Sequence, residues 1–252
     1  MAAHEQPIYA VEYVRGFATS TRPQLLRCSN GCDYAVKFKD NRIGPYTVAN
    51  EWICYRIASH IGLPVPQAAL ITITDQFIQA TPQLRSVTGT NRLPEAGLQF
   101  GSAWIDNATQ FSSKEEVVAA LNNISNRDCV AGIILFDRWL LNVDRKAQNL
   151  LRVPQSGMVR IVMIDHGHCL GINGHSEWVA NFSPVEAKLG VHLLHSLAPP
   201  ASNSHWSTVI ASVDDQFIGE VVRDLPSEWN IGREARSRLA DYLCGRKTRL
   251  TI

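Results

Sequence analysis

One stretch constrains the fold of this chain more than any other: residues 136–170, FDRWLLNVDRKAQNLLRVPQSGMVRIVMIDHGHCL. Its pattern predicts a helix end, a polar loop, a strand, a turn and a second strand. Asp144, Lys146 and Asn149 lie in the predicted loop, and Asp165 lies at the end of the second strand. If the two strands pair, Asp165 returns to the side of Asn149. Three oxygen-bearing side chains and one ammonium would then converge.

These four side chains suit phosphoryl transfer, for which a protein supplies positioning and charge rather than covalent chemistry. Asp144 could accept the proton of an acceptor hydroxyl, and Lys146 could face the transferring phosphate. Asn149 and Asp165 offer oxygen ligands of the kind that Mg²⁺ prefers. An Asp-x-x-x-x-Asn spacing also occurs by chance, and Asp before a small residue is a common turn. The hairpin that follows favours the catalytic interpretation.

A kinase interpretation requires a lysine and an acidic partner upstream, and the sequence contains both. Lys37 lies in the apolar strand YAVKF, where a lysine needs a counter-charge. Glu51 lies in the first turn of a helix predicted over 48–61, whose apolar residues recur at helical spacing. The alternatives are an edge-strand lysine that discourages aggregation and a carboxylate that complements the helix dipole.

A hydroxyl-rich loop, GFATSTRPQ at 16–24, precedes the first hairpin strand. Its main-chain N–H groups and the hydroxyls of Thr19, Ser20 and Thr21 could bind phosphate, assisted by Arg22. The loop is not a Gly-x-Gly-x-x-Gly sequence, and an ordinary turn explains it equally well. From the order of the elements, we expect an adenine to lie against the main chain of residues 98–105.

The order of the elements predicts an α+β protein that is β-rich with one helix up to residue 105 and mostly helical beyond it. We expect two lobes, 1–105 for nucleotide binding and 106–252 for the catalytic loop and metal site. Segment 83–97 is polar and rich in Gly and Pro, which predicts a loop. The predicted strands are 8–15, 25–29, 33–38 (joined to 25–29 by an Asn-Gly turn), 65–73, 76–82 and 98–105. The predicted helices are 48–61, one that follows Ser112-Ser113, 127–142, 183–195, 207–222 and 227–246, with a loop over 198–204.

Charge and composition limit the partners. The formal net charge of +1 gives no electrostatic case for nucleic acid or a membrane. The N-terminus lacks a basic segment followed by an apolar run, and no apolar run approaches the length of a membrane span, so we expect a cytoplasmic protein. The six cysteines show no zinc spacing and are expected to be reduced and mostly buried.

Together these motifs resemble the HipA-like kinases, and within them a small bacterial branch without the additional N-terminal domain of the HipA toxins. The resemblance spans about residues 14–170 and is most specific where NVDRKAQNLL is followed by IDHG. That loop is also similar to the Asp-Arg-x-x-x-Asn loop of the phosphoinositide kinases. The resemblance implies a bilobal protein-kinase-like fold with a catalytic β-hairpin in its C-lobe. It also implies ATP and Mg²⁺ as cofactors and transfer of the γ-phosphoryl group to a hydroxyl, expected to be Ser or Thr of a protein.

The resemblance implies roles for particular residues. Lys37 would bind the ATP phosphates, and Glu51 would pair with it. Asp144 would be the catalytic base, and Asn149 and Asp165 would hold the metal.

The sequence departs from the protein kinases on either side of these residues. Val143 precedes Asp144, so there is no His-Arg-Asp motif, and His166 stands where protein kinases have Phe after the metal-binding Asp. Regulation through that Phe therefore cannot be carried over. HipA-type toxins are inhibited by phosphorylation of a serine in the phosphate loop, and Ser20 is the nearest candidate here.

Two other classes of function stay open. One is a kinase for a small molecule or lipid headgroup, although the near-neutral charge disfavours a membrane lipid. The other is a pseudokinase or scaffold that binds nucleotide or a regulatory, antitoxin-like protein. The four polar positions that catalysis needs are present, namely Lys37, Asp144, Asn149 and Asp165, so the sequence does not favour an inactive enzyme.

Overall fold

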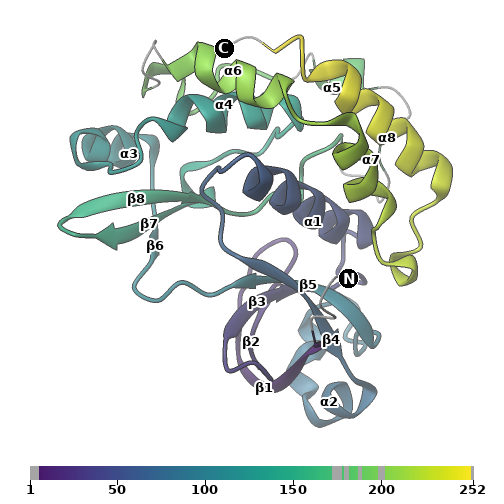
Figure 1. Ribbon diagram of the computed structural model, residues 1–252. Coiled ribbons are helices and arrows are strands. Elements are labelled where there is room, and N and C mark those ends of the chain that lie inside the picture. The colour runs from purple at the N-terminus through teal and green to yellow at the C-terminus, as the bar shows by residue number, and fades with distance from the viewer. Residues whose placement is uncertain (1–5, 172–177, 179–181, 187–188, 198–201, 251–252) are drawn as a thin grey trace.

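The N-terminal strands close into a barrel, a closure that the sequence pattern did not predict. The computed structural model of the protein describes residues 6–171, 178, 182–186, 189–197 and 202–250. The strand order is β1-β2-β3-β5-β4, and a parallel pairing of β1 with β4 completes the ring (Figure 1). The barrel strands are β1 (Ile8–Gly16), β2 (Gln24–Cys28), β3 (Asp33–Lys37), β4 (Ala68–Ile73) and β5 (Gly97–Ala103).

The predicted hairpin around the Asn-Gly pair is confirmed, since β2 and β3 pair antiparallel. Strand β3 pairs on its other side with β5, where Lys37 stands opposite Phe100. Lys37 therefore lies on an interior strand, and the edge-strand alternative is wrong. The barrel interior is filled by apolar side chains that are inaccessible to water, among them Leu26, Val36 and Ile71.

The strand predicted over 76–82 is wrong, because the chain forms helix α2 (Asp75–Ala80) there. The Thr74 hydroxyl accepts the Phe77 N–H at 3.1 Å, and Asp75 adds a carboxylate to the first turn. These local bonds stabilise a helix start and outweigh the apolar alternation. The segment predicted as a loop follows, and its beginning is the short 3-10 helix η1 (Pro82–Ser86).

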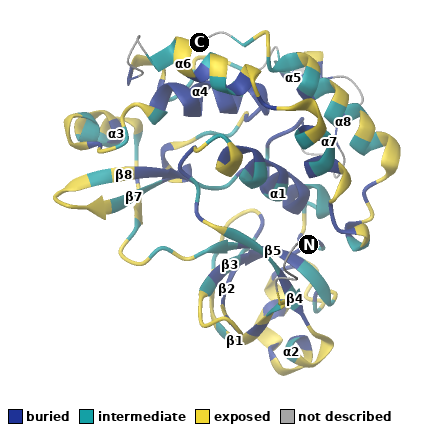
Figure 2. Ribbon diagram, in the orientation of Figure 1, coloured by how far each residue is buried: buried dark blue, intermediate teal, exposed yellow. Residues whose placement is uncertain are grey.

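Helix α1 (Pro45–His60) lies between the barrel and the other helices (Figure 1). It begins at Pro45 rather than at residue 48, since proline is preorganised for the first helical position. The predicted stripe is buried, with Ala49 and Ile53 inaccessible to water, and so is Asn50 on another side of the helix. Figure 2 shows that most of α1 is covered. The helix therefore packs against neighbours on more than one face.

The predicted catalytic hairpin is present as β7 (Leu150–Gln155) and β8 (Met158–Met163), with Leu150 opposite Met163. A two-residue strand, β6 (Thr109–Gln110), extends the sheet in the order β6-β7-β8. Upstream are α3 (Lys114–Ala120), the 3-10 helix η2 (Leu121–Asn123) and α4 (Cys129–Trp139), and the 3-10 helix η3 (Ala147–Asn149) leads into β7. Helix α4 is buried from Val130 to Asp137 and ends at the polar loop.

The C-terminal helices are shorter than predicted. The helix predicted over 183–195 is reduced, in its described part, to α5 (Ser183–Glu186) and the 3-10 helix η4 (His195–Leu197). The helix predicted over 207–222 is wrong as one element: it is α6 (Ser202–Ala211) and α7 (Asp215–Arg223), because the Asp214 carboxylate accepts the Gln216 N–H at 2.7 Å and starts a new helix. The last is α8 (Arg233–Arg246), preceded by the 3-10 helix η5 (Ser227–Trp229). Of the predicted loop 198–204, residues 198–201 lie outside the described residues and the remainder belongs to α6. None of the described helices is long and apolar enough to cross a membrane.

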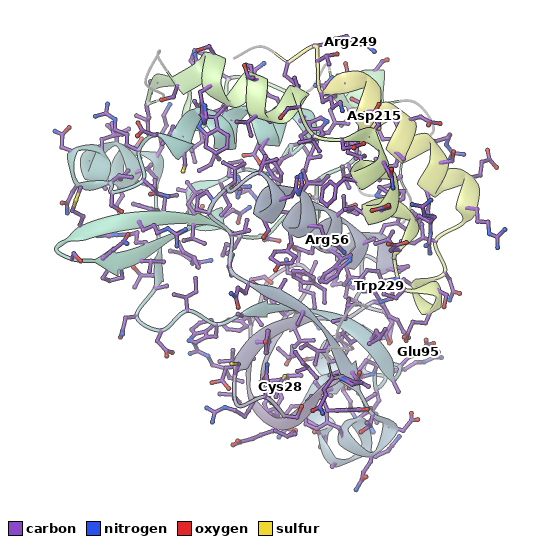
Figure 3. The ribbon with its side chains drawn as sticks, in the orientation of Figure 1. Cys28, Arg56, Glu95, Asp215, Trp229 and Arg249 are labelled. Atoms are coloured by element: carbon purple, nitrogen blue, oxygen red, sulfur yellow. The ribbon has the colours of Figure 1, made fainter. Side chains whose placement is uncertain are left out.

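Helix η5 ties the helical part of the chain to the barrel. The Glu228 carboxylate accepts the Leu98 N–H at 2.9 Å, and the Trp229 indole N–H donates to the Leu98 carbonyl at 2.8 Å. Gly97 permits this contact, because a Cβ at that position would lie 1.8 Å from a Glu228 carboxylate oxygen. Figure 3 places Trp229 where the helices meet the barrel. The bonds to Leu98 thereby hold β5 beside α1.

Candidate functional site

A cavity of about 320 Å³ lies where the barrel, α1 and the end of β8 meet. Barrel residues Lys37 and Phe100 line it, together with Glu51 of α1 and the pair Asp165-His166 that follows β8. Its remaining lining is largely apolar, which is typical of a small-molecule site with a few convergent polar groups. Segment 98–105, against which we expect the adenine, contributes four further lining residues (Ser102, Ala103, Trp104 and Ile105).

Three charged side chains meet in this cavity. The Lys37 ammonium forms an ion pair with Glu51 and lies 2.6 Å from a carboxylate oxygen of Asp165. The Lys37 and Glu51 side chains are 10% and 4% exposed, whereas Asp165 is 33% exposed. Glu51 lies beyond the first turn of α1, which holds no acidic residue, so the helix-dipole alternative is wrong. Side chains from strand, helix and hairpin end are therefore brought together by the tertiary fold.

The charges of this cluster stabilise one another. Burial alone would lower the pKa of Lys37, but the carboxylates of Asp165 and Glu51 outweigh burial and raise that pKa above its ordinary value of 10.5. Burial alone would raise the pKa of Glu51, but Lys37 and His166 outweigh it and hold that pKa well below 4.5. Lys37 and Glu51 are therefore both charged at neutral pH.

The backbone turns sharply at Asp165. Asp165 has a φ of 60°, in the left-handed region, whereas Gly167 does not adopt a positive φ. Asp165 therefore makes this turn itself, in a conformation that Asp tolerates better than most residues. The Asn50 amide then binds the carbonyls of Gly167 and Cys169, at 2.9 and 2.7 Å. These bonds fix the segment after Asp165 against α1.

The polar loop lies beside this cluster. The Asn149 side-chain N–H donates to the Asp144 carbonyl at 2.8 Å, and the Ile164 N–H donates to the Asn149 carbonyl at 3.1 Å. Asn149 is thus one hydrogen bond away from the residue that precedes Asp165. Lys146 lies 2.6 Å from Asp144, and its side chain is 63% exposed. The hairpin therefore brings all four predicted residues of the stretch to one end of the sheet.

Of the three predicted hydroxyl residues of the loop, one lines the cavity. Thr19 lines the cavity, whereas Ser20 and Thr21 are not among its lining residues. Thr21 is buried, with 2% exposure, and Ser20 is exposed. The backbone at Arg22 is left-handed, with a φ of 46°, and turns the chain there. The structure therefore does not bring Ser20 and Thr21 together with Lys37.

Sequence reasoning missed a buried network behind the loop. The Arg145 guanidinium binds the Asp137 carboxylate with two nitrogens, at 2.8 and 2.9 Å, and His192 lies 2.8 Å from the same carboxylate. Burial alone would raise the pKa of Asp137, but Arg145 and His192 outweigh it and hold that pKa well below 3.8. An Asp inside the apolar run AGIILFDRWLL was a signal that a buried partner exists. No pattern in the sequence pointed to His192.

His166 is a second residue whose surroundings the sequence did not reveal. It is 3% exposed, and its Nδ1 lies 3.8 Å from a Glu51 carboxylate oxygen. The ring packs edge-on against Phe136, with centroids 5.9 Å apart. Its Nε2 has no hydrogen-bond partner among the described residues. His166 thus lies in the cavity wall beside the charged cluster.

The oxygen atoms available for a metal are few. Within the described part of the chain, no group of three or more His, Cys, Asp or Glu side chains could hold a metal ion. One Asp165 oxygen faces Lys37. The Asn149 side-chain N–H donates to the Asp144 carbonyl, so the side-chain amide oxygen of Asn149 stays available as a ligand. This set fits Mg²⁺, which is commonly bound by one or two protein oxygens together with substrate phosphates and water.

Comparison with known proteins assigns the family. The model of the HipA-like kinases matches residues 14–245. The chain belongs to the HipA-like kinase family. A comparison with curated proteins finds no match. The match extends through the C-terminal helices, well beyond the motifs around Asp144 and Asp165 that carried the resemblance.

Solved structures similar to this HipA-like kinase show the same kind of fold. The proinflammatory kinase CtkA of Helicobacter pylori has a TM-score of 0.65 at 14% identity, over 95% of this chain and 92% of that chain. HipA of Shewanella oneidensis MR-1, in a complex with HipB and operator DNA, has a TM-score of 0.55 at 12% identity, over 98% of this chain and 64% of that chain. A Golgi casein kinase with Mn and ADP bound has a TM-score of 0.50 at 10% identity, over 96% and 71% of the two chains. The fold is therefore α+β and kinase-like.

Proposed function

We propose that this HipA-like kinase uses ATP and Mg²⁺ to phosphorylate a hydroxyl group, with Ser or Thr of a protein as the acceptor. The observation that carries the proposal is the cluster of Lys37, Glu51 and Asp165 in a cavity beside the Asp144–Asn149 loop. A lysine, a metal-binding carboxylate and a catalytic loop around one cavity are the parts that phosphoryl transfer needs. We further propose two lobes that meet near residue 105, with the nucleotide between them.

In this proposal the nucleotide lies in the main cavity. Lys37 binds the phosphates, and Glu51 holds the Lys37 ammonium in place through their ion pair. Thr19 lines the same cavity, so the loop that carries it would cover the phosphates. Asn149 and Asp165 would hold Mg²⁺, and the ion would supply positive charge to stabilise the phosphate oxygens. The Golgi casein kinase structure, which contains Mn and ADP, supports a nucleotide with a divalent metal.

Asp144 is proposed as the base. The acceptor oxygen forms a bond to the γ-phosphorus, the bond from phosphorus to the ADP oxygen breaks, and the hydroxyl proton passes to the Asp144 carboxylate. Lys146 is flexible enough to leave Asp144 and face the transferring phosphate, since its side chain is 63% exposed and exposed ion pairs are weak.

The test is incubation of the purified protein with γ-labelled ATP and Mg²⁺, beside Asp144→Ala. We expect label on protein with the wild type and none with the variant, while ATP binding by the variant is retained. The exposed Ser20 is the first residue to examine for label. A Mg²⁺-dependent thermal shift with ATP but no label would mean that the protein is a nucleotide-binding scaffold or that its acceptor is missing from the assay. The absence of both label and shift would refute the proposal.

The Shewanella HipA structure, which includes HipB, motivates a search for a regulatory protein partner. If such a partner exists, it should alter the labelling of the wild-type protein when it is added.

A further inference from the structure

A second, smaller cavity of about 100 Å³ lies between the end of α4 and segment 189–193. Its walls include Asp137, Arg145 and His192, whose side chains are 1%, 2% and 7% exposed. Buried ionisable groups are costly unless each is paired and hydrogen-bonded. The pairing of these three groups therefore shows what the network holds in place.

The hydrogen bonds of His192 determine its tautomer. The Leu194 N–H donates to Nδ1 of His192 at 3.1 Å, so Nδ1 must present a lone pair. A neutral imidazole with an unprotonated Nδ1 carries its proton on Nε2. Nε2 lies 2.8 Å from an Asp137 carboxylate oxygen and donates to it. His192 thus connects a turn of the C-terminal region to α4 through one directed bond.

The Asp137 carboxylate collects four such donors. One oxygen accepts from the Asn142 amide at 2.7 Å and from Arg145 at 2.9 Å. The other oxygen accepts from Arg145 at 2.8 Å and from His192 at 2.8 Å. Both oxygens are filled, so the carboxylate cannot rotate without breaking a bond.

Asn142 and Arg145 extend these constraints to the proposed catalytic residues. The Asn142 side-chain oxygen accepts the Asp144 N–H at 3.1 Å. A single nitrogen of Arg145 donates to the carbonyl of Asn149 at 2.8 Å and to that of Ile164 at 3.0 Å. Each of the three acidic or amide residues of the proposed site is therefore held directly, or through its neighbour Ile164, by a group bound to Asp137.

We propose that Asp137 and His192 are positioning residues, which set the geometry of the loop and of the hairpin end for phosphoryl transfer without contacting the substrates. The proposal rests on the function proposed above. Removal of the His192 bond should allow Asp137 and Arg145 to shift, and with them Asn149 and the backbone before Asp165. Such outer-shell partners typically change metal affinity or activity by about 10- to 100-fold.

The two nitrogens of His192 can be tested separately. In His192→Gln, the side-chain N–H group can reach Asp137 in place of Nε2–H. In His192→Asn, the shorter side chain can only accept the Leu194 N–H in place of Nδ1. We expect His192→Asn to lower kcat and the apparent affinity for Mg²⁺ by about 10-fold or more, with ATP affinity within about twofold, and His192→Gln to restore most of the loss. The matched control is His195→Ala, because His195 is an exposed residue of η4.

A merely structural role of His192 predicts a different pattern. If His192 only shapes its own turn, His192→Asn should behave like the wild type and His192→Gln should be the defective variant. That result, or equal activity of all three proteins, would overturn the proposal.

Amide hydrogen exchange of residues 142–149 supplies a readout that does not depend on activity. The exchange rate of these amides should rise in His192→Asn and not in His195→Ala. This expectation holds even if the wild-type protein transfers no phosphate. Unchanged exchange would refute the positioning role itself, whereas absent transfer in the wild type would refute only the proposed function.

Discussion

Glu51→Gln tests whether the Lys37 ion pairs stabilise the fold as the structure implies. The variant leaves the Lys37 ammonium buried with Asp165 as its remaining carboxylate partner. Removal of one partner from a buried ion pair costs about 3–5 kcal/mol. Because Asp165 remains as a partner and is 33% exposed to water, we expect a loss smaller than this range, about 2–3 kcal/mol in the free energy of unfolding at pH 7.

Urea unfolding followed by tryptophan fluorescence measures this loss, provided that the slope with denaturant is unchanged. Glu234→Gln is the matched control, because Glu234 is 88% exposed in its pair with Arg238 and should lose less than about 0.5 kcal/mol. The double variant Lys37→Met, Glu51→Gln should lose at least about 1 kcal/mol less than the sum of the losses in the two single variants, since the two residues interact directly. Additive losses, or a Glu51→Gln variant as stable as the wild type, would refute the reasoning.

Three further perturbations follow from the same structure. The pKa values of Glu51 and Asp137 are lowered because the folded state stabilises their charged forms. Their contribution to the free energy of unfolding should therefore be complete above pH 4.5 and should decrease as the pH falls below 4.5 and then 3.8. Urea midpoints between pH 7 and pH 3 should show this decrease, and it should be smaller in Glu51→Gln. Asp165→Asn and Asp165→Ala should both lose Mg²⁺-dependent nucleotide binding in a thermal-shift titration with an EDTA control. Both also remove an ion pair of Lys37, but the alanine variant should unfold about 1 kcal/mol more easily than the asparagine variant, because asparagine tolerates the left-handed backbone better. Gly97→Ala should cost at least about 2 kcal/mol in the same urea assay, since φ is 116° and the new Cβ meets Glu228; Glu228→Ala in the same chain should relieve the collision but not the backbone strain, and full recovery would contradict that division.

The hairpin of β7 and β8 was predictable because its signals are local. The polar loop, the two apolar runs and the turn between them specify β7 and β8, and pairing of adjacent strands then returns Asp165 to Asn149. The contact between Lys37 and Glu51 was predicted from what a kinase requires and from the family resemblance. Where local signals competed, as at Thr74, a capping hydroxyl decided for a helix against an apolar alternation that suggested a strand.

Only the tertiary structure decided which residues from distant parts of the chain become hydrogen-bond partners. The choice of His192 as a partner for Asp137, and of Glu228 and Trp229 for the backbone of Leu98, depends on which surfaces pack together. Closure of the barrel likewise depends on the parallel pairing of β1 with β4. Periodicity and capping act over a few residues along the chain and determine the elements, and thus the sequence by itself determined the hairpin and the polar residues at its end. Buried polar groups find their hydrogen-bond partners through space, so the network of Asp137, Arg145 and His192 became visible only in the folded molecule.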